Sequence, residues 1–257
     1  MNQASEDSKK VYFISDLHLG ASYIPDRREQ ERRICAFLDS IAADASDLYL
    51  LGDVLDYWFE YRTVVPRGYI RFFGALARLV DGGVRVHWFI GNHDIWLFDY
   101  LRDEIGIEVV DGYVEREIKG KLFFMTHGDG VGRIKPMFRL LRNTFRCRVC
   151  QKLYASIHPR WTIPFAHGWS KSSRGSDYSS PPPFEGETEA LTCFCRSWLA
   201  GHPDRQPDYF VFGHRHALVD YRLNKDSRMI ILGDWISQDS YAVFDGDRLE
   251  LRCFSTN

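Results

Sequence analysis

Short apolar runs alternate with longer amphipathic stretches in the first half of the chain. Runs rich in β-branched and aromatic residues that end in glycine or polar residues predict buried strands, whereas apolar positions three and four residues apart predict helices. Strands are expected at residues 11–15, 48–51, 84–90, 122–126, 209–212, 217–223, 229–232, 241–244 and 248–254. Helices are expected at residues 26–43, 68–80, 95–105 and 187–199. The alternation of the two patterns is typical of an α/β fold.

The length and composition fit one large globular domain, or one domain with an insertion. The chain has 257 residues, of which 45% are hydrophobic and 26% charged, so it can bury a substantial core. Its apolar runs are interrupted well before the roughly 18 residues that a membrane span needs. Residues 1–10 are polar and lack the pattern of an export signal, so we expect an intracellular protein with reduced cysteines.

The charge is unevenly distributed along the sequence. Residues 131–176 contain ten Lys and Arg residues and no Asp or Glu, while the rest of the chain has 23 basic against 35 acidic residues. Aromatic and aliphatic side chains are interspersed with these basic ones. A segment that is both cationic and apolar suits an anionic ligand with apolar parts, or an anionic membrane surface. A solvated basic helix face is the alternative interpretation.

Two of the six cysteines, Cys147 and Cys150, are separated by two residues within this basic segment. This spacing occurs in zinc sites and in redox-active sites. No second pair of ligands follows at a matching spacing, so we interpret the pair as structural or incidental.

Polar residues that can bind metals follow five of the predicted strands. Because the carboxyl ends of strands in an open α/β sheet border a common crevice, we expect these five turns to meet. One such turn alone is weak evidence for a metal site, but five in one crevice predict a dinuclear site for Mn²⁺, Fe²⁺ or Zn²⁺. The turns are Asp16-Leu17-His18, Gly52-Asp53, Gly91-Asn92-His93-Asp94, His127-Gly128-Asp129 and Gly213-His214-Arg215-His216.

The residue types suggest a role for each ligand. A carboxylate can bridge two cations, and we assign this position to Asp53. One ion is expected to bind Asp16, His18 and His216, and the other Asn92, His127 and His214. A water between two such ions becomes acidic enough to attack phosphorus near neutral pH. His93 is placed to stabilise or protonate the departing oxygen, with Asp94 orienting its ring.

The five turns, in this order, resemble the signature of the calcineurin-like metallophosphoesterase superfamily. The resemblance spans residues 11–234 and implies an α/β sandwich of two mixed β-sheets flanked by helices. We expect residues 1–130 and 186–257 to form this core. Residues 131–185, here called the insertion, are expected to form a helical lid.

A narrower resemblance is to the UDP-2,3-diacylglucosamine diphosphatase family of lipid A biosynthesis. It rests on the stretch DLYLLGDVLDYW at residues 47–58 and on a basic, aromatic insertion directly after His127-Gly128-Asp129. It implies a Mn²⁺-dependent enzyme that cleaves the pyrophosphate of a UDP-linked glycolipid to UMP and 2,3-diacylglucosamine 1-phosphate. We also expect a monomer that binds peripherally to the cytoplasmic face of the bacterial inner membrane.

Several residues are candidates for substrate contacts. Ser170-Lys171 resembles a Ser-Lys pair in the lid of that family, and basic residues of the insertion suit a phosphate. The best-known branch of the family has Arg at the position of His93, which leaves another lipid-linked or nucleotide phosphodiester open as the substrate. The expected substrate-binding residues are Asn92, His93, Arg133, Lys135, Ser170, Lys171 and Arg174.

Three other function classes are less well supported. A nucleotide phosphodiesterase or a protein Ser/Thr phosphatase does not need an insertion rich in Phe, Trp and Leu. A non-enzymatic scaffold is expected to have lost some ligands, and this chain retains all of them. A nucleic-acid binder is disfavoured by the acidic remainder of the chain and by the absence of a recognisable binding motif.

Overall fold

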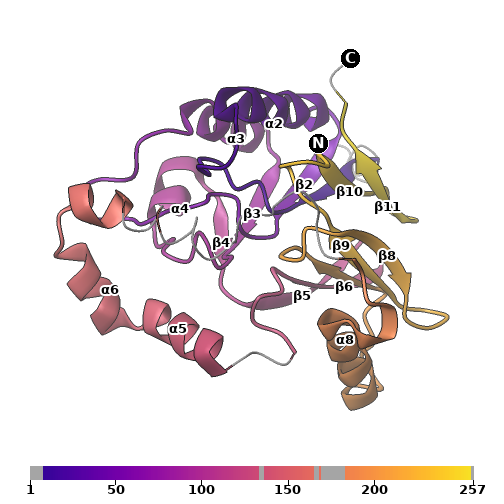
Figure 1. The fold of residues 1–257 in the computed structure, drawn as a ribbon. Coiled ribbons are helices and arrows are strands. Elements are labelled where there is room, and N and C mark those ends of the chain that lie inside the picture. The colour runs from indigo at the N-terminus through magenta and orange to yellow at the C-terminus, as the bar shows by residue number, and fades with distance from the viewer. Residues whose placement is uncertain (1–7, 133–135, 165–167, 169–182, 256–257) are drawn as a thin grey trace.

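The computed structural model describes residues 8–132, 136–164, 168 and 183–255. Two mixed β-sheets pack face to face, with helices on the outer surface of each sheet (Figure 1). This is the expected α/β sandwich of two mixed sheets flanked by helices.

The first sheet has six strands in the order β11-β10-β1-β2-β3-β4. Strands β1 to β4 are parallel, β10 pairs antiparallel with β1, and β11 pairs antiparallel with β10. The strands are β1 (Lys10–Ile14), β2 (Ala45–Leu50), β3 (Arg85–Phe89), β4 (Glu108–Val110), β10 (Ser240–Phe244) and β11 (Leu249–Cys253).

The second sheet has five strands in the order β5-β6-β7-β9-β8. Strands β6, β7 and β9 are parallel to one another, whereas β5 and β8 form antiparallel edges. The strands are β5 (Tyr113–Ile118), β6 (Lys121–Thr126), β7 (Tyr209–Phe212), β8 (Leu218–Arg222) and β9 (Arg228–Leu232).

Alternation along the central strands divides the core into layers. In β1, Phe13 points into the layer between the two sheets, and Ile14 points toward the outer helices. Phe124 of β6 likewise belongs to the layer under the helix of the second sheet, while Phe123 lies between the sheets. Both faces of each central strand are therefore buried, which explains their nearly continuous apolar sequences.

Three helices lie against the first sheet and one helix lies against the second. The helices on the first sheet are α2 (Arg27–Ile41), α3 (Ile70–Asp81) and α4 (Tyr100–Ile105). The helix on the second sheet is α8 (Ala190–Gly201), and the short 3₁₀ helix η1 (Gly186–Thr188) precedes it. Asp26 caps α2 by accepting a hydrogen bond from the backbone N–H of Glu29 at 2.9 Å. No helix among the described residues is long and apolar enough to cross a membrane.

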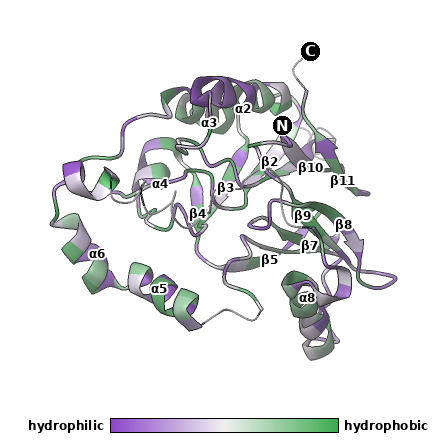
Figure 2. Cartoon of the chain, viewed as in Figure 1, coloured by the Kyte–Doolittle hydropathy of each residue, from purple (hydrophilic) through white to green (hydrophobic). Residues whose placement is uncertain are grey.

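The described part of the insertion forms α5 (Pro136–Arg146) and α6 (Arg148–Ala155), which lie beside the body of the molecule (Figure 1). Neither helix buries a residue fully, and both mix apolar and polar positions (Figure 2). Aromatic contacts attach them to the core. The Trp96 Nε1–H donates to the Phe145 carbonyl at 2.9 Å, and Trp96 stacks on Tyr154 with ring centroids 5.1 Å apart.

Most predicted elements are present with shifts of one to three residues at their ends, but three regions differ. The helix expected at residues 95–105 is only α4, which begins at Tyr100. Strands β4 and β5 were not predicted. Glu60 explains the late start of α4, because its Oε2 accepts hydrogen bonds from the N–H groups of residues 98, 99 and 100 at 2.6–3.2 Å.

Candidate metal centre

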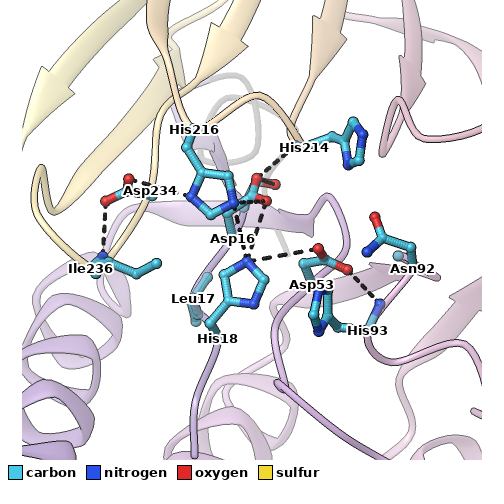
Figure 3. Close-up of polar contacts among 12 residues, drawn as sticks. Asp16, Leu17, His18, Asp53, Asn92, His93, His214, His216, Asp234 and Ile236 are labelled. Atoms are coloured by element: carbon cyan, nitrogen blue, oxygen red, sulfur yellow. Dashed lines mark hydrogen bonds and ion pairs between the residues drawn. The ribbon is translucent and has the colours of Figure 1, made fainter. Parts of the chain in front are cut away.

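The candidate site lies where the carboxyl ends of parallel strands from both sheets meet. Strands β1, β2 and β3 lead to Asp16, Asp53 and Asn92, respectively. In the second sheet, β6 leads to His127 and β7 to His214. Figure 3 shows side chains from both sheets converging on this region.

Five of the seven expected ligands have a left-handed backbone conformation, which non-glycine residues adopt only where surrounding structure enforces it. Hydrogen bonds between turns hold this conformation: Asp16 N–H donates to Gly52 O at 3.1 Å, and His18 N–H donates to Asp53 O at 2.9 Å. The φ angles are 55° at Asp16, 45° at His18, 51° at Asp53, 67° at His214 and 53° at His216.

Two glycines permit the close approach of the turns. A Cβ atom at Gly91 would lie 2.2 Å from Asp53 Oδ1, and one at Gly213 would lie 1.8 Å from Ser15 Oγ. Both distances are far shorter than any real contact. The glycines next to the ligands are therefore required by packing as well as by the turns themselves.

One group of candidate ligands consists of Asp16, His18 and His216. Each residue offers an atom, and these atoms lie within 4.8 Å of one another. His18 Nε2 is 3.2 Å from His216 Nε2, which in turn is 3.3 Å from Asp16 Oδ1. Separations near 3 Å are those expected of two atoms that each lie about 2.1 Å from a common ion.

A second group consists of Asp53, His127 and His214, again with one atom each within 4.8 Å. His127 Nε2 lies 3.4 Å from Asp53 Oδ2 and 3.2 Å from the amide oxygen of Asn92. The opposite ring nitrogen, His127 Nδ1, donates to the carbonyl of Leu51 at 2.8 Å. This hydrogen bond fixes the tautomer and leaves Nε2 as the atom available to a metal ion.

Asp53 joins the two groups. Its Oδ2 is 3.7 Å from His18 Nε2 in the first group, besides its contact with His127 in the second. Asp53 Oδ1 accepts a hydrogen bond from the His93 N–H at 2.8 Å, which fixes the carboxylate orientation. This placement is the one that a bridging carboxylate requires.

A buried oxygen without a partner supports the fit of cations to these residues. Asp16 Oδ1 has no hydrogen-bond partner, although the residue is completely buried. Its other oxygen, Oδ2, accepts hydrogen bonds from Ser15 Oγ at 2.5 Å and from the His214 N–H at 2.8 Å. A lone carboxylate oxygen that faces two imidazoles is costly in the core unless a cation compensates it.

The neighbouring charged groups shift the pKa values of the histidines at the site. Burial lowers the pKa of His127 and His216, but neighbouring carboxylates together outweigh it and raise the pKa of each imidazole. Asp53 contributes most at His127, and Asp16 and Asp234 contribute most at His216. Burial and neighbouring His127 lower the pKa of His214 to about 4. The acidic residues thus draw protons onto two histidines, and divalent cations can replace those protons.

Two buried carboxylates outside the expected ligand set contact the histidines. Asp234 Oδ2 is 3.4 Å from His216 Nδ1, and its Oδ1 accepts from the Ile236 N–H at 2.9 Å (Figure 3). Asp56 Oδ1 is 3.7 Å from His18 Nδ1. Such partners orient ligand histidines. Asp234 follows β9, and this position after a strand is the only feature of the sequence that indicates a role for it at the site.

The structure corrects the expected role of Asp94. Its two oxygens accept hydrogen bonds from the N–H groups of Gly91, Asp53 and Val54 and from Trp88 Nε1 at 2.8–3.3 Å, so it fastens turns together and does not orient His93. The His93 Nδ1 atom instead lies 3.1 Å from the carbonyl and 3.5 Å from the carboxylate of Asp56. His18, Asp56 and His93 form a third group of possible ligand atoms, which shares His18 with the first.

Only part of the insertion, in which substrate contacts are expected, lies within the described residues. Arg133, Lys135, Ser170, Lys171 and Arg174 lie outside the described residues. Within the described part, Arg142 Nε donates to Asp129 Oδ2 at 3.0 Å, which links α5 to the turn that carries His127.

Comparisons with known proteins find a matching family, similar sequences and a similar solved structure. The profile of the calcineurin-like phosphoesterase family matches residues 9–218. A UDP-2,3-diacylglucosamine hydrolase of Porphyromonas gingivalis is 45% identical, over 94% of this chain and 96% of its own length. A protein of the same name from Neisseria gonorrhoeae is 29% identical, over 92% and 94%. Among solved structures, Yfce, a phosphoesterase from E. coli, aligns with 95% of this chain and 92% of its own, with a TM-score of 0.46 and 17% identity.

The match to the family covers most of the chain and includes all five polar turns, and the first relative aligns over nearly the full length of both proteins. Family membership implies a dinuclear divalent metal site, in keeping with the two groups of ligand atoms. The chain therefore belongs to the calcineurin-like phosphoesterase family and is a metal-dependent hydrolase.

Proposed function

We propose that the protein hydrolyses UDP-2,3-diacylglucosamine at the pyrophosphate, releasing UMP and 2,3-diacylglucosamine 1-phosphate. The name of the P. gingivalis relative, which aligns over nearly all of both chains, supports this substrate. The observation that carries the hydrolytic part of the proposal is the position of Asp53 between two groups of metal ligands. The expected monomeric state stays a prediction.

We assign Asp16, His18, His216 and Asp53 to one ion, and Asp53, Asn92, His127 and His214 to the other. When bound, the two cations would supply charge for the phosphate oxygens and lower the pKa of a water. The mixed carboxylate, imidazole and amide set suits Mn²⁺, which is the metal we propose. Asp234 and Asp56 hold the histidines that face these positions.

His93 is proposed to stabilise and protonate the leaving oxygen. Its Nδ1–H is directed at the carbonyl of Asp56, which can only accept a hydrogen bond. The ring therefore delivers a proton from Nε2 only in its doubly protonated form. Asp56 acts as a positioning residue here, because its carboxylate lies 3.5 Å from the same nitrogen.

The insertion is proposed to receive the acyl chains and to contact the membrane surface. Leu140 is 62% exposed on α5, Leu153 is 65% exposed on α6, and Trp161 is 70% exposed. Three large apolar side chains exposed within one segment suit contact with an apolar partner. The same segment is strongly basic, which suits the anionic cytoplasmic face of a bacterial inner membrane.

The substrate is tested by release of UMP from UDP-2,3-diacylglucosamine. We expect release by the protein with Mn²⁺, and none by protein stripped of metal or by the Asp53→Ala variant. The Asp204→Asn variant, which changes an exposed carboxylate, serves as the control. Metal-dependent hydrolysis of an aryl phosphodiester without UMP release would overturn the substrate and favour another lipid-linked or nucleotide phosphodiester.

Membrane contact is tested by sedimentation with vesicles that contain anionic phospholipids. Substituting Leu153→Ser and Trp161→Ser together should weaken binding, whereas Leu218→Ser, at a 39% exposed position on β8, should not. Unchanged binding of the double variant would contradict docking through the insertion.

A further inference from the structure

The pair Cys147 and Cys150 lies at the joint between α5 and α6. Cys147 is the residue that precedes α6, with an extended backbone (φ −69°, ψ 117°), and Cys150 is in the first turn of this helix. The Gln151 N–H donates to the Cys147 carbonyl at 2.9 Å, which closes that turn. In a helical turn the Cα atoms of residues three apart lie about 5 Å from each other. This lies within the Cα–Cα separation of roughly 4.4–6.8 Å that a disulfide spans.

The two thiols are accessible and differ in acidity. Cys147 is exposed and Cys150 is partly exposed. Hydrogen bonds from the backbone N–H groups of Cys150 and Val149, and then from the Cys150 thiol, lower the pKa of Cys147. The hydrogen bond with Cys147 raises the pKa of Cys150. An exposed thiol with a lowered pKa beside a second thiol is the arrangement of an attacking and a resolving cysteine.

The other cysteines lack this arrangement. Burial raises the pKa of Cys35 to about 11 and also raises that of the buried Cys195. Cys193 and Cys253 are exposed, and the Cys193 thiol donates to the Glu187 carbonyl at 3.4 Å. The three groups of possible metal ligands found among the described residues contain no cysteine, which disfavours zinc at the pair.

We propose that Cys147 and Cys150 form a reversible dithiol–disulfide site whose oxidant is a low-molecular-weight disulfide such as oxidised glutathione. The Cys147 thiolate attacks one sulfur of the external disulfide, forming a mixed disulfide and releasing one thiolate. The Cys150 sulfur then attacks Cys147 Sγ and releases the second thiol. Two protein thiols become one disulfide, and one external disulfide becomes two thiols, so protons and electrons balance.

The position of the site links oxidation to the attachment of the insertion. The Phe145 carbonyl, two residues before Cys147, accepts from Trp96 Nε1 and from Gln151 Nε2, both at 2.9 Å. A disulfide would fix the turn that carries these two contacts. The inference concerns the thiols alone and does not depend on the proposed substrate.

The test uses the full chain incubated at neutral pH with reduced and oxidised glutathione in varied ratios. Free thiols are then blocked in acid with N-ethylmaleimide, and tryptic peptides are analysed by mass spectrometry. We expect residues 147–148 and 149–152 to appear as one linked species, two hydrogens lighter than the separate peptides. The species should grow with oxidised glutathione and disappear with dithiothreitol.

Single substitutions assign the two roles. Cys150→Ser should retain glutathione on Cys147, because nothing resolves the mixed disulfide, while Cys147→Ser should react more slowly at Cys150. Cys253→Ser is the control and should form the link normally. The proposal is overturned if no link forms under oxidising glutathione, if Cys147 links instead to Cys193 or Cys253, or if the pair proves to be blocked by bound zinc.

Discussion

Asp53 and His127 follow strands of different sheets, yet Asp53 Oδ2 lies 3.4 Å from His127 Nε2. The contact brings the end of β2 in the first sheet to the end of β6 in the second. A metal centre built on it depends on how the sheets pack as well as on the local turns. Changes outside the ligand set should therefore affect metal binding.

Removing the charge of Asp234 should weaken metal binding without removing a ligand. Asp234→Asn takes away the carboxylate that faces His216 Nδ1, so the imidazole loses its orienting partner. Loss of such a partner typically costs 10–100-fold in metal affinity. Titration with Mn²⁺ followed by calorimetry measures this, and affinity equal to that of the wild type would exclude an orienting role.

His93 variants separate proton transfer from charge stabilisation. His93→Ala should lower kcat by about 10²–10⁴-fold, the usual contribution of a positioned acid. His93→Arg keeps a positive charge but cannot donate a proton, and we expect its kcat to fall between those of the alanine variant and the wild type. Steady-state assays decide the matter, since full activity of His93→Arg would show that no proton is delivered from this position.

A methyl group at Gly213 should disrupt the site through Ser15 and Asp16. Gly213→Ala places a Cβ where Ser15 Oγ and Asp16 Oδ2 lie only 1.8 and 2.6 Å away. We expect unfolding free energy to fall by about 1–3 kcal/mol, as for other overpacked sites, together with loss of metal. Gly201→Ala, whose Cβ would meet nothing within 4 Å, is the matched control for denaturant unfolding.

Asp47, which is not among the candidate metal ligands, should make the stability of the protein depend on pH. Burial raises the pKa of Asp47, but hydrogen bonds from His87 and Arg85 outweigh it and hold the pKa below its usual range. A depressed pKa in the folded state stabilises the protein above the unfolded pKa of about 3.9, and this contribution disappears as the pH falls further.

Asp47→Asn should therefore lower the unfolding free energy by about 1–3 kcal/mol at pH 7. The difference from the wild type should stay constant down to about pH 5 and shrink below about pH 4. Urea unfolding at several pH values checks this. Asp220→Asn, which breaks a partly exposed pair with Arg228, should change stability by no more than about 1 kcal/mol. A difference that grows on acidification would contradict the assignment to Asp47.

The fold class and the convergence of the five turns could be predicted because the central strands are buried on both faces. Their sequences are nearly all apolar, and polar residues begin where each strand leaves the core, as at Ile14 and Asp16. The position of a strand end therefore also indicates the place of a ligand. Metal binding by these residues stays a prediction.

The features that the sequence did not predict depend on contacts between residues that are distant in the sequence, or on charged residues in a strand. The start of α4 is set by Glu60, about forty residues earlier, whose carboxylate holds the first N–H groups. Strand β5 carries charged residues such as Glu115 and Arg116, so its sequence does not resemble a buried strand. The role of Asp94 was wrong because adjacency to His93 in the sequence does not place the two side chains together.

The most direct test of the dinuclear site is the metal content of the protein and of the Asp53→Asn variant. Each is loaded with Mn²⁺, desalted and measured by elemental analysis, with Asp204→Asn as the control for loss of one charge and circular dichroism as the control for folding. Because Asp53 joins both ligand groups, two ions per chain are expected in the wild type and the control, and at most one in Asp53→Asn. Two ions in a folded Asp53→Asn variant, or a single ion in the wild type, would contradict the bridging role of Asp53.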